Sequence, residues 1–288
     1  MGMGCSKNED NENNPDKPDK PSPLPDLPDP NDVCSCMDDI IFMQYCYDNF
    51  DVNKDGKVSK IEALAVAKID LTRLEIKTLT GISYFSNLEI LNCKECYELT
   101  TVDLSNNLKI RIGYEMFYTC SKLSKIVLPN NILEIGASAF YGCSSLKNID
   151  IPDKVTEIGR SAFAGCESLT SIIIPEGVTE IMGYTFNQCR SLISITIPKG
   201  VTEIGEAAFY LCESLTSIII PEGVTEIGTA AFGYCRRLTN IYCRAVTPPR
   251  TSYDLGLTGF TLYVPAQSIE IYKNSPWSNY YSSIEPIE

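Results

Sequence analysis

The chain has 288 residues, of which 44% are hydrophobic and 21% charged, and a formal net charge of -13. This composition is ordinary for a globular protein of one or two domains, the negative charge argues against a nucleic-acid partner, and no apolar run is long enough to cross a membrane as a helix. The absence of histidine removes the usual general base and argues against an enzyme.

Residues 1–33 contain seven prolines among many Asp, Asn and Lys residues. Low hydrophobicity and the fixed φ angles of proline predict an extended, disordered tether. Cys5, followed by a polar and acidic stretch, resembles the start of a mature bacterial lipoprotein, which implies lipidation at Cys5 and a signal peptide removed ahead of it. The alternative is N-myristoylation, because Gly2 with Ser6 also fits that motif.

The loop from Asp51 to Glu62 gives residues 34–72 the pattern of a single EF-hand. Oxygen-bearing side chains stand at loop positions 1, 3, 5, 9 and 12, with Gly56 at position 6, which is typical of a Ca²⁺ loop. Helical patterns precede this loop over residues 38–50 and follow it over residues 60–69. The alternative is a degenerate hand that folds without metal. The expected Ca²⁺ ligands are Asp51, Asn53, Asp55, the Lys57 carbonyl, Ser59 and Glu62.

No second loop of this kind is visible, although EF-hands generally work in pairs joined at loop position 8. Val58 at that position therefore lacks its expected partner. We expect the hand to pack against the first coil of the array that follows and to cover its open edge, because solenoid ends need caps. Calcium then has a structural role rather than a sensory one.

Residues 73–105 carry looser Leu-x-x-Leu units that join the hand to this array. Four cysteines in and near these segments have Cys-x-Cys and Cys-x-x-Cys spacings, which allow a zinc site, although no histidine supports it. A local disulfide or free thiols is the favoured interpretation. The sequence leaves open how Cys34, Cys36, Cys46, Cys93 and Cys96 pair.

Residues 106–243 contain six copies of a 23-residue repeat. A period of this length with Leu-x-x-Ile-x-Ile inside it predicts a leucine-rich-repeat solenoid with one short strand per coil. One coil buries too little apolar surface to fold alone, so the coils must stack. The aligned columns are Ile112, Ile135, Ile158, Ile181, Ile204 and Ile227; Phe117, Phe140, Phe163, Phe186, Phe209 and Phe232; Cys120, Cys143, Cys166, Cys189, Cys212 and Cys235; and Leu123, Leu146, Leu169, Leu192, Leu215 and Leu238.

The Leu-x-x-Ile-x-Ile strand of each coil is expected to line the concave face, with a second extended piece on the opposite side. Side chains between its core positions then point outward, because alternate residues of a strand face opposite sides. That face is the default binding surface of a solenoid. The candidate ligand-binding residues are Ser171, Ile173, Ser194, Thr196, Ser217, Ile219 and Tyr242.

The cysteine column is expected to consist of free, buried thiols. Side chains stacked about 4.8 Å apart in parallel coils lack the facing geometry of a disulfide, and cysteine is small and apolar enough for a tight core. Reactive or metal-binding thiols are the alternative. A further column of glutamates is expected to be a solvated row of like charges, with a cation-binding stripe as the alternative. It consists of Glu134, Glu157, Glu180, Glu203 and Glu226.

The repeat resembles the BspA-like leucine-rich repeats, whose signature is Ile-x-x-x-Ala-Phe-x-x-Cys-x-x-Leu-x-x-Ile. The copy from Ile204 to Ile218 matches it, whereas Met116 and Thr185 replace the alanine in two other copies, where we expect different packing. The resemblance covers residues 106–243. It implies a surface-exposed bacterial protein that adheres to host proteins or to other bacteria, and calcium-binding hands before such repeats also resemble members of this family.

Residues 244–288 follow the last repeat and show a strand-like pattern at 260–264 and a helical one at 268–273. We expect a small C-terminal cap over the last coil, as in similar BspA-like arrays. The alternative is sugar stacking by the aromatic residues of this segment, which are Tyr272, Trp277, Tyr280 and Tyr281.

These features predict an α/β chain: a leucine-rich-repeat solenoid with a helical EF-hand cap and a small C-terminal cap. The leading functional hypothesis is a non-enzymatic, monomeric adhesion protein, lipid-anchored at the outer membrane or cell surface, that binds an extracellular protein on its solenoid surface. The runner-up is an accessory glycan-binding lipoprotein, which predicts exposed aromatic rings clustered on one face. Tyr242 is the only ring expected in its column, which argues against the runner-up.

Overall fold

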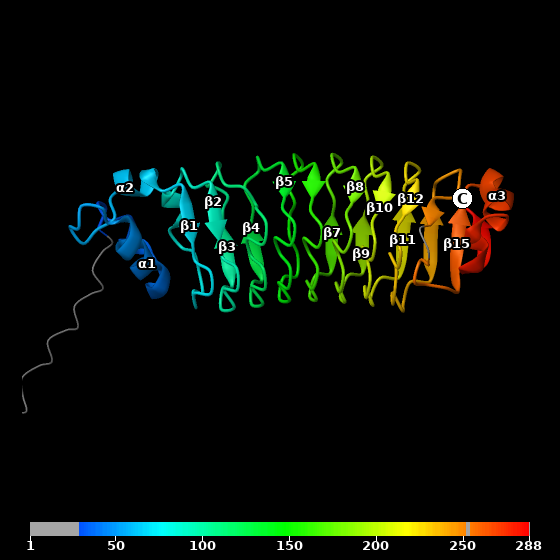
Figure 1. Cartoon of the computed structure of the whole chain (residues 1–288), viewed down its shortest axis with the longest axis horizontal. Coiled ribbons are helices and arrows are strands. Elements are labelled where there is room, and N and C mark those ends of the chain that lie inside the picture. Colours follow the sequence, from blue (N-terminus) through cyan, green and yellow to red (C-terminus); the bar gives the residue numbers. More distant parts are fainter. Residues whose placement is uncertain (1–28, 252–253, 288) are drawn as a thin grey trace, which may run out of the picture.

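The computed structural model describes residues 29–251 and 254–287. They form one elongated stack of coils, with helices α1 (Ile40–Phe50) and α2 (Lys60–Ala65) at one end and α3 (Ile269–Lys273) at the other (Figure 1). The coils run nearly straight along the long axis in this view. Among the described residues, no helix is both long and apolar enough to cross a membrane.

The two N-terminal helices begin at side-chain caps. The Asp39 carboxylate accepts hydrogen bonds from two N–H groups of the first turn of α1, and Ser59 forms a reciprocal capping box with Glu62 at the start of α2. Helix α2, predicted to reach residue 69, ends at Ala65, because the next residues form a strand that pairs with the neighbouring coil. The 3₁₀ turns are η1 (Val33–Cys36), η2 (Ile82–Tyr84), η3 (Ala266–Ser268) and η4 (Pro276–Asn279).

Each coil contributes short strands to two sides of the stack, and all strand pairs are parallel. One side, which we call the Glu face, comprises β1 (Lys68–Asp70), β2 (Ile90–Asn92), β5 (Glu134–Ile135), β6 (Glu157–Ile158), β8 (Glu180–Ile181), β10 (Glu203–Ile204), β12 (Glu226–Ile227) and β14 (Arg250–Thr251). The other side, the Ser/Thr face, comprises β3 (Thr101–Asp103), β4 (Lys125–Val127), β7 (Ser171–Ile173), β9 (Ser194–Thr196), β11 (Ser217–Ile220), β13 (Asn240–Cys243), β15 (Phe260–Val264) and β16 (Tyr281–Pro286).

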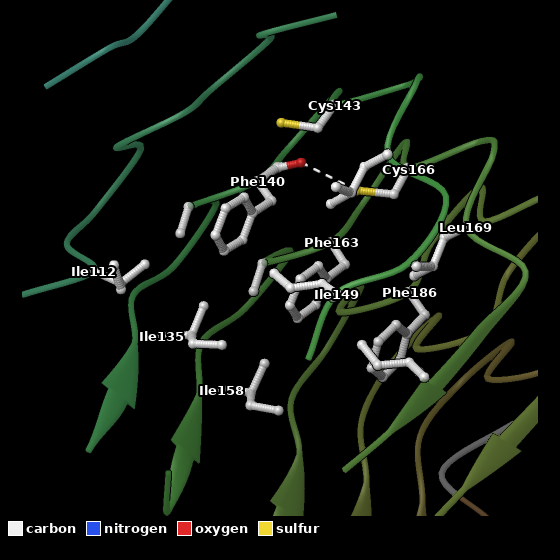
Figure 2. Packing of buried hydrophobic residues seen from close by; sticks show 14 of the residues in the cluster. Ile112, Ile135, Phe140, Cys143, Ile149, Ile158, Phe163, Cys166, Leu169 and Phe186 are labelled. Carbon is white, nitrogen blue, oxygen red and sulfur yellow. Dashed lines mark hydrogen bonds between the residues drawn. The ribbon is translucent and has the colours of Figure 1, made fainter. Parts of the chain in front are cut away.

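The predicted columns form the core between these faces. The six phenylalanines are fully buried, and neighbouring rings stack with centroids 5.4–5.8 Å apart and nearly parallel planes. The column cysteines are free and buried, as predicted. Each thiol donates to a carbonyl of the preceding coil, for example from Cys166 to Phe140 at 3.2 Å (Figure 2). This bond satisfies the one polar hydrogen that a cysteine brings into the core.

In most coils of the repeat, a glycine directly after the isoleucine of the Glu-face strand lets successive coils approach closely; the exception in the array is Ile181, which is followed by Met182. A Cβ atom on Gly159, Gly205 or Gly228 would lie 2.4–2.5 Å from a backbone nitrogen of the preceding coil. No side chain fits in that space, so the glycines of the repeat set the spacing of the stack.

The hydrogen bonding of the stack continues beyond the last repeat. Strand β14 pairs with β12 on the Glu face, and β15 and β16 extend the Ser/Thr face in register with β13. The strand predicted at 260–264 and the helix predicted at 268–273 are confirmed as β15 and α3, whereas β16 was not predicted. A parallel sheet continues through backbone pairing and does not require the repeat motif.

Two of the C-terminal aromatic residues lie inside the molecule. Tyr272 and Trp277 are buried, and their polar groups donate to the carbonyls of Ala245 and Pro249. Their rings contact each other edge to face with centroids 5.7 Å apart. These two side chains therefore pack beneath the last coil, and they are not available for the sugar stacking considered as the alternative.

Candidate functional site

The predicted ligand residues lie on the outer surface of the Ser/Thr face, within a strip that carries no charged side chain. The chain has 24 basic and 37 acidic residues, yet five successive strands are free of charge at their outward positions. Ile173 and Ile219 are 72% and 47% exposed. We call this set the neutral strip. It comprises Ser171, Ile173, Ser194, Thr196, Ser217, Ile219, Asn240, Tyr242, Thr261 and Tyr263.

Tyr242 has an aromatic neighbour that the 23-residue period does not predict. Tyr263 lies in register with it on β15, and the two rings stack with centroids 4.5 Å apart and an interplanar angle of 14°. The prediction that Tyr242 is the only ring in its column is therefore wrong. Tyr263 follows Tyr242 by 21 positions instead of 23, so it falls outside the columns of the 23-residue repeat.

A hollow of about 410 Å³ lies beside this tyrosine pair at the C-terminal end of the neutral strip. It is lined by Tyr242, Tyr263, Glu285, Pro286 and Ile287. Glu285 stands in register with Tyr263 on the adjacent strand β16, and its side chain is exposed. The hollow therefore combines aromatic rings with a carboxylate.

A second hollow of about 440 Å³ lies at the N-terminal end of the Ser/Thr face. Its lining is hydroxyl-rich and includes Thr78, Thr101, Asp103 and Lys125. Both signs of charge are present here, in contrast to the neutral strip. The two ends of the face thus differ in chemistry.

The predicted calcium loop is closed by hydrogen bonds between its own backbone and its oxygen-bearing side chains. Asp51 accepts from the N–H groups of Asp55 and Gly56 at 3.2 and 2.9 Å. Asn53 accepts from the Asp55 N–H, and Glu62 reaches back to the Val52 N–H at 2.9 Å. These bonds hold the backbone of the loop in a turn.

The loop matches a Ca²⁺ site in some respects and differs in others. Its donors are the hard oxygens that Ca²⁺ prefers, and Gly56 has the positive φ of 82° that the sharp turn at loop position 6 requires. Glu62, however, is also engaged by the Ser59 hydroxyl and N–H, and the Lys57 ammonium lies 2.7 Å from Asp29. Across the described residues, no three acidic, cysteine or histidine side chains gather as metal ligands.

Val58 has a partner within its own chain. Its carbonyl accepts from the Val33 N–H at 2.9 Å, and its N–H donates to the carboxylate of Asp32 at 3.2 Å. Asp32 is buried and also accepts from Cys34 N–H and from the Tyr47 hydroxyl at 2.6 Å. Residues 32–33 thus occupy the place expected for the position-8 residue of a second hand.

The helical pair lies directly against the first coil. The second oxygen of Asp39 accepts from the Lys77 N–H at 2.6 Å, the Tyr45 hydroxyl accepts from the Asp70 N–H, and the rings of Phe50 and Phe85 lie 5.5 Å apart. Both helices and the array share one buried apolar cluster. These contacts tie α1 to the edge of the stack.

The cysteines considered for zinc are free in the structure and do not form a four-membered group. The Cys96 thiol donates to the Leu71 carbonyl at 3.0 Å, and the Cys36 thiol donates to the Val33 carbonyl at 3.2 Å. Cys36 is partly buried, whereas Cys34, Cys93 and Cys96 are buried. Within the described part of the chain these cysteines therefore do not gather into a zinc site.

The glutamates of the Glu face stand in register on neighbouring strands. Burial and the flanking carboxylates of Glu180 and Glu226 raise the pKa of Glu203 above its ordinary value. At the C-terminal end of the row, Arg250 pairs with Glu226 at 3.4 Å. The row is therefore exposed and mutually repulsive, with one ion pair at its end.

Two parallel faces joined by stacked Ile, Phe, Cys and Leu columns define a leucine-rich-repeat solenoid. A family model of the BspA type leucine rich repeat region matches in six copies, over residues 38–145, 87–195 and 110–239. The chain belongs to this family. It is a repeat family rather than a catalytic one, and its members are usually cell-surface proteins of bacteria.

Solved structures of bacterial leucine-rich proteins are similar to the chain. A leucine-rich cell surface protein from Faecalibacterium prausnitzii is 27% identical with a TM-score of 0.48, over 68% of this chain and 61% of that one. A leucine-rich repeat protein from T. pallidum is 27% identical with a TM-score of 0.45, over 52% of this chain and 72% of that one. The chain thus spans 61% of the length of the first protein. No protein of curated function matches the sequence.

Proposed function

We propose that this protein is a non-enzymatic binding protein of the bacterial cell surface that holds an extracellular protein on its Ser/Thr face. The observation that carries the proposal is the neutral strip, an uncharged and partly apolar surface on a strongly acidic chain. Depletion of charge together with half-exposed tyrosine is typical of the centre of a protein interface. Ser, Asn and Tyr are also the residues that antibody loops use to bind proteins.

A charged substitution within the neutral strip tests this proposal. Purified protein is screened on arrays of extracellular-matrix and bacterial surface proteins, and Ile219→Glu is compared on every positive target. Leu108→Glu is the matched control, because Leu108 is 54% exposed and lies outside the strip. We expect Ile219→Glu to weaken binding at least tenfold and Leu108→Glu to leave it unchanged. Equal binding by all three proteins would remove the Ser/Thr face as the binding surface.

Glycan binding is the second candidate function, and one observation favours it. The Tyr242–Tyr263 pair supplies two adjacent half-exposed rings beside hydroxyl-bearing residues. A glycan array probed with the same proteins separates the candidates: binding to glycans without binding to any protein would favour this function over the first.

We further propose that the loop from Asp51 to Glu62 binds Ca²⁺ and that the ion has a structural role. The donors would be the side chains of Asp51, Asn53, Asp55, Ser59 and Glu62 with the Lys57 carbonyl. The ion supplies a positive charge that offsets the repulsion among these carboxylates. The pre-formed turn at Gly56 supports this assignment, and the contacts between α1 and the first coil support a structural role.

Lipidation of Cys5 remains a proposal for how the protein is held at the surface, and Cys5 lies outside the described residues. Metabolic labelling of the expressed protein with an alkyne fatty acid tests it. We expect incorporation that Cys5→Ser abolishes. We also propose that the chain acts as a monomer, which light scattering of the purified protein checks.

A further inference from the structure

The hollow beside Tyr263 presents a carboxylate without a cationic partner. None of its lining residues is basic, and Glu285 takes part in none of the ion pairs formed among the described residues. One face of the Tyr263 ring is covered by Tyr242. Glu285 lies on the adjacent strand β16, in register with Tyr263, and its side chain lines the hollow.

In two other places the protein holds a cation beside both a tyrosine ring and a glutamate carboxylate. The Arg160 guanidinium lies 4.6 Å from the centroid of the Tyr184 ring and 3.4 Å from the Glu206 carboxylate. Tyr184 also donates its hydroxyl hydrogen to Glu206 at 2.7 Å. The ring face and the carboxylate thus hold one guanidinium between them, through cation–π and ionic attraction.

A second group repeats the arrangement with lysine. The Lys94 ammonium lies 4.9 Å from the centroid of the Tyr118 ring and forms an ion pair with Glu115. Both groups lie in other parts of the array and both are filled by a basic residue of the chain itself. They show that a tyrosine ring and a glutamate carboxylate on this solenoid together hold a basic side chain. Tyr184 and Glu206 do so from adjacent coils, and Tyr118 and Glu115 from one coil.

Tyr263 and Glu285 also stand next to each other, in register on the adjacent strands β15 and β16, and both line the hollow. On the preceding strand, the residue in register with Tyr263 is Tyr242, whose ring stacks on that of Tyr263. Among the described residues that line the hollow, there is therefore a ring and a carboxylate but no basic side chain.

We propose that this hollow receives a lysine or arginine side chain of the bound protein. The proposal rests on the function proposed for the Ser/Thr face and specifies one contact within it. The charged group lies between the Tyr263 ring and the Glu285 carboxylate, while the methylene stem packs on Pro286 and Ile287, as long basic side chains do on apolar surfaces. The net charge of -13 favours approach of a basic partner.

The contact is tested first with small probes, so that no protein ligand is needed. Protein labelled with 3-fluorotyrosine is titrated with the N-acetyl methylamides of lysine and of arginine, with the norleucine compound as the neutral analogue. The resonances of Tyr242 and Tyr263 are assigned from Tyr→Phe variants. We expect both to shift with the cationic probes and not with norleucine.

Variants of the hollow and matched controls complete the experiment. Glu285→Gln removes the charge and Tyr263→Leu removes the ring, and we expect each to weaken binding of the cationic probes about two- to fivefold. Glu270→Gln and Tyr97→Leu change an acidic and an aromatic side chain elsewhere on the surface, and we expect no effect. Circular dichroism of each variant verifies folding.

Three outcomes would overturn the proposal: no shift with either cation, equal shifts with norleucine, or binding of methyl glucoside with no binding of the cations. The affinity for a protein found on the arrays gives a separate test. If Ile219→Glu abolishes its binding while Glu285→Gln and Tyr263→Leu leave it unchanged, the basic contact is wrong and the Ser/Thr face still binds. If none of the three affects it, the function proposed for that face fails as well.

Discussion

The guanidinium of Arg160 lies 3.4 Å from the carboxylate of Glu206, although a full coil of the solenoid separates these two residues. The intervening coil has Gly183 at the crossing point, where a Cβ atom would lie 2.9 Å from the Arg160 Nη1 atom. The guanidinium also lies over the Tyr184 ring, 4.6 Å from its centroid. One glycine thus allows an ion pair to connect three successive coils.

The first prediction is that Gly183→Ala removes the coupling between Arg160 and Glu206 with little change in overall stability. The pair is exposed, so its coupling is worth about 0.5 kcal/mol. Alanine also lowers the conformational entropy of the unfolded chain. This stabilises the folded state by about as much as the loss of the ion pair destabilises it. Urea unfolding of Arg160→Gln, Glu206→Gln and the double variant gives the coupling free energy. It should fall to near zero in the Gly183→Ala background, and an unchanged coupling would contradict this account of the glycine.

The second prediction concerns the neighbouring glycine. Gly205→Ala should lower the free energy of unfolding by about 2 kcal/mol or more. Adding an atom to a close-packed region destabilises a protein by this amount when the neighbouring atoms cannot move aside. The new Cβ would lie 2.5 Å from the backbone nitrogen of Gly183, whereas at Gly183 itself the closest atom belongs to a flexible side chain. Gly183→Ala is therefore the matched control. Equal melting temperatures for the two variants would show that the coil spacing is not fixed by backbone contact.

The third prediction is that Glu203→Gln stabilises the protein at neutral pH. The pKa of Glu203 is raised in the folded state. The stability that Glu203 contributes is therefore fully present at pH values below the ordinary glutamate pKa, and it is lost as the pH rises through the folded-state pKa. The gain from Glu203→Gln should therefore be present at pH 7, at up to about 1 kcal/mol, and vanish on acidification to pH values below the ordinary glutamate pKa. It should also shrink in about 1 M salt. A gain that is independent of pH and salt would exclude repulsion within the row as its cause.

The array could be predicted from the sequence because its residues repeat at a fixed period. The Phe117 to Phe232 column, the buried thiols and the outward positions of β7, β9 and β11 all follow from that period, and the structure agrees with them. Periodicity alone determines these positions, since each coil must present the same side chains to its neighbours.

The C-terminal end of the candidate site could not be predicted in the same way. Tyr263 and Glu285 belong to coils whose lengths depart from 23 residues, so no column includes them. Their alignment with Tyr242 depends on the backbone pairing of three strands, which no local pattern in the tail encodes. The position of Tyr263 and Glu285 beside Tyr242 therefore follows from the three-dimensional structure and not from the sequence pattern.

The partner of Val58 was missed for a related reason. Asp32 and Val33 lie at the end of a proline-rich segment assigned to the tether, and nothing in their spacing indicates pairing with a loop 26 positions away. The signal available was the apolar Val33 after a run of polar residues, which is too weak alone to predict a contact.

The fourth prediction concerns thiol reactivity. Among the described cysteines only Cys36 is partly exposed, and burial raises the pKa of the Cys143 and Cys189 thiols above their ordinary value. A buried, protonated thiol is a poor nucleophile. Labelling with a maleimide, followed by peptide mass spectrometry, should modify Cys36 rapidly and the column cysteines only after denaturation. Labelling of Cys143 in the native protein as fast as Cys36 would argue against a closed core.

The final prediction joins Asp32 to the proposed calcium loop. Asp32→Ala leaves the buried N–H groups of Cys34 and Val58 and the Tyr47 hydroxyl without their acceptor, at a cost of about 1–3 kcal/mol for each group that finds no other partner. Hydrogen exchange should therefore quicken across η1 and the loop while the coils from β5 onward remain protected.

If Ca²⁺ binds the loop, saturating Ca²⁺ should slow exchange in the same region of the unmodified protein, since a ligand stabilises the state that binds it. Glu62→Gln should abolish the effect of Ca²⁺, and Asp153→Asn, an exposed carboxylate of the array, is the control for charge. Protection that is unchanged by Asp32→Ala would mean that residues 32–33 do not hold the hand in place. A response to Ca²⁺ that survives Glu62→Gln would place the ion elsewhere.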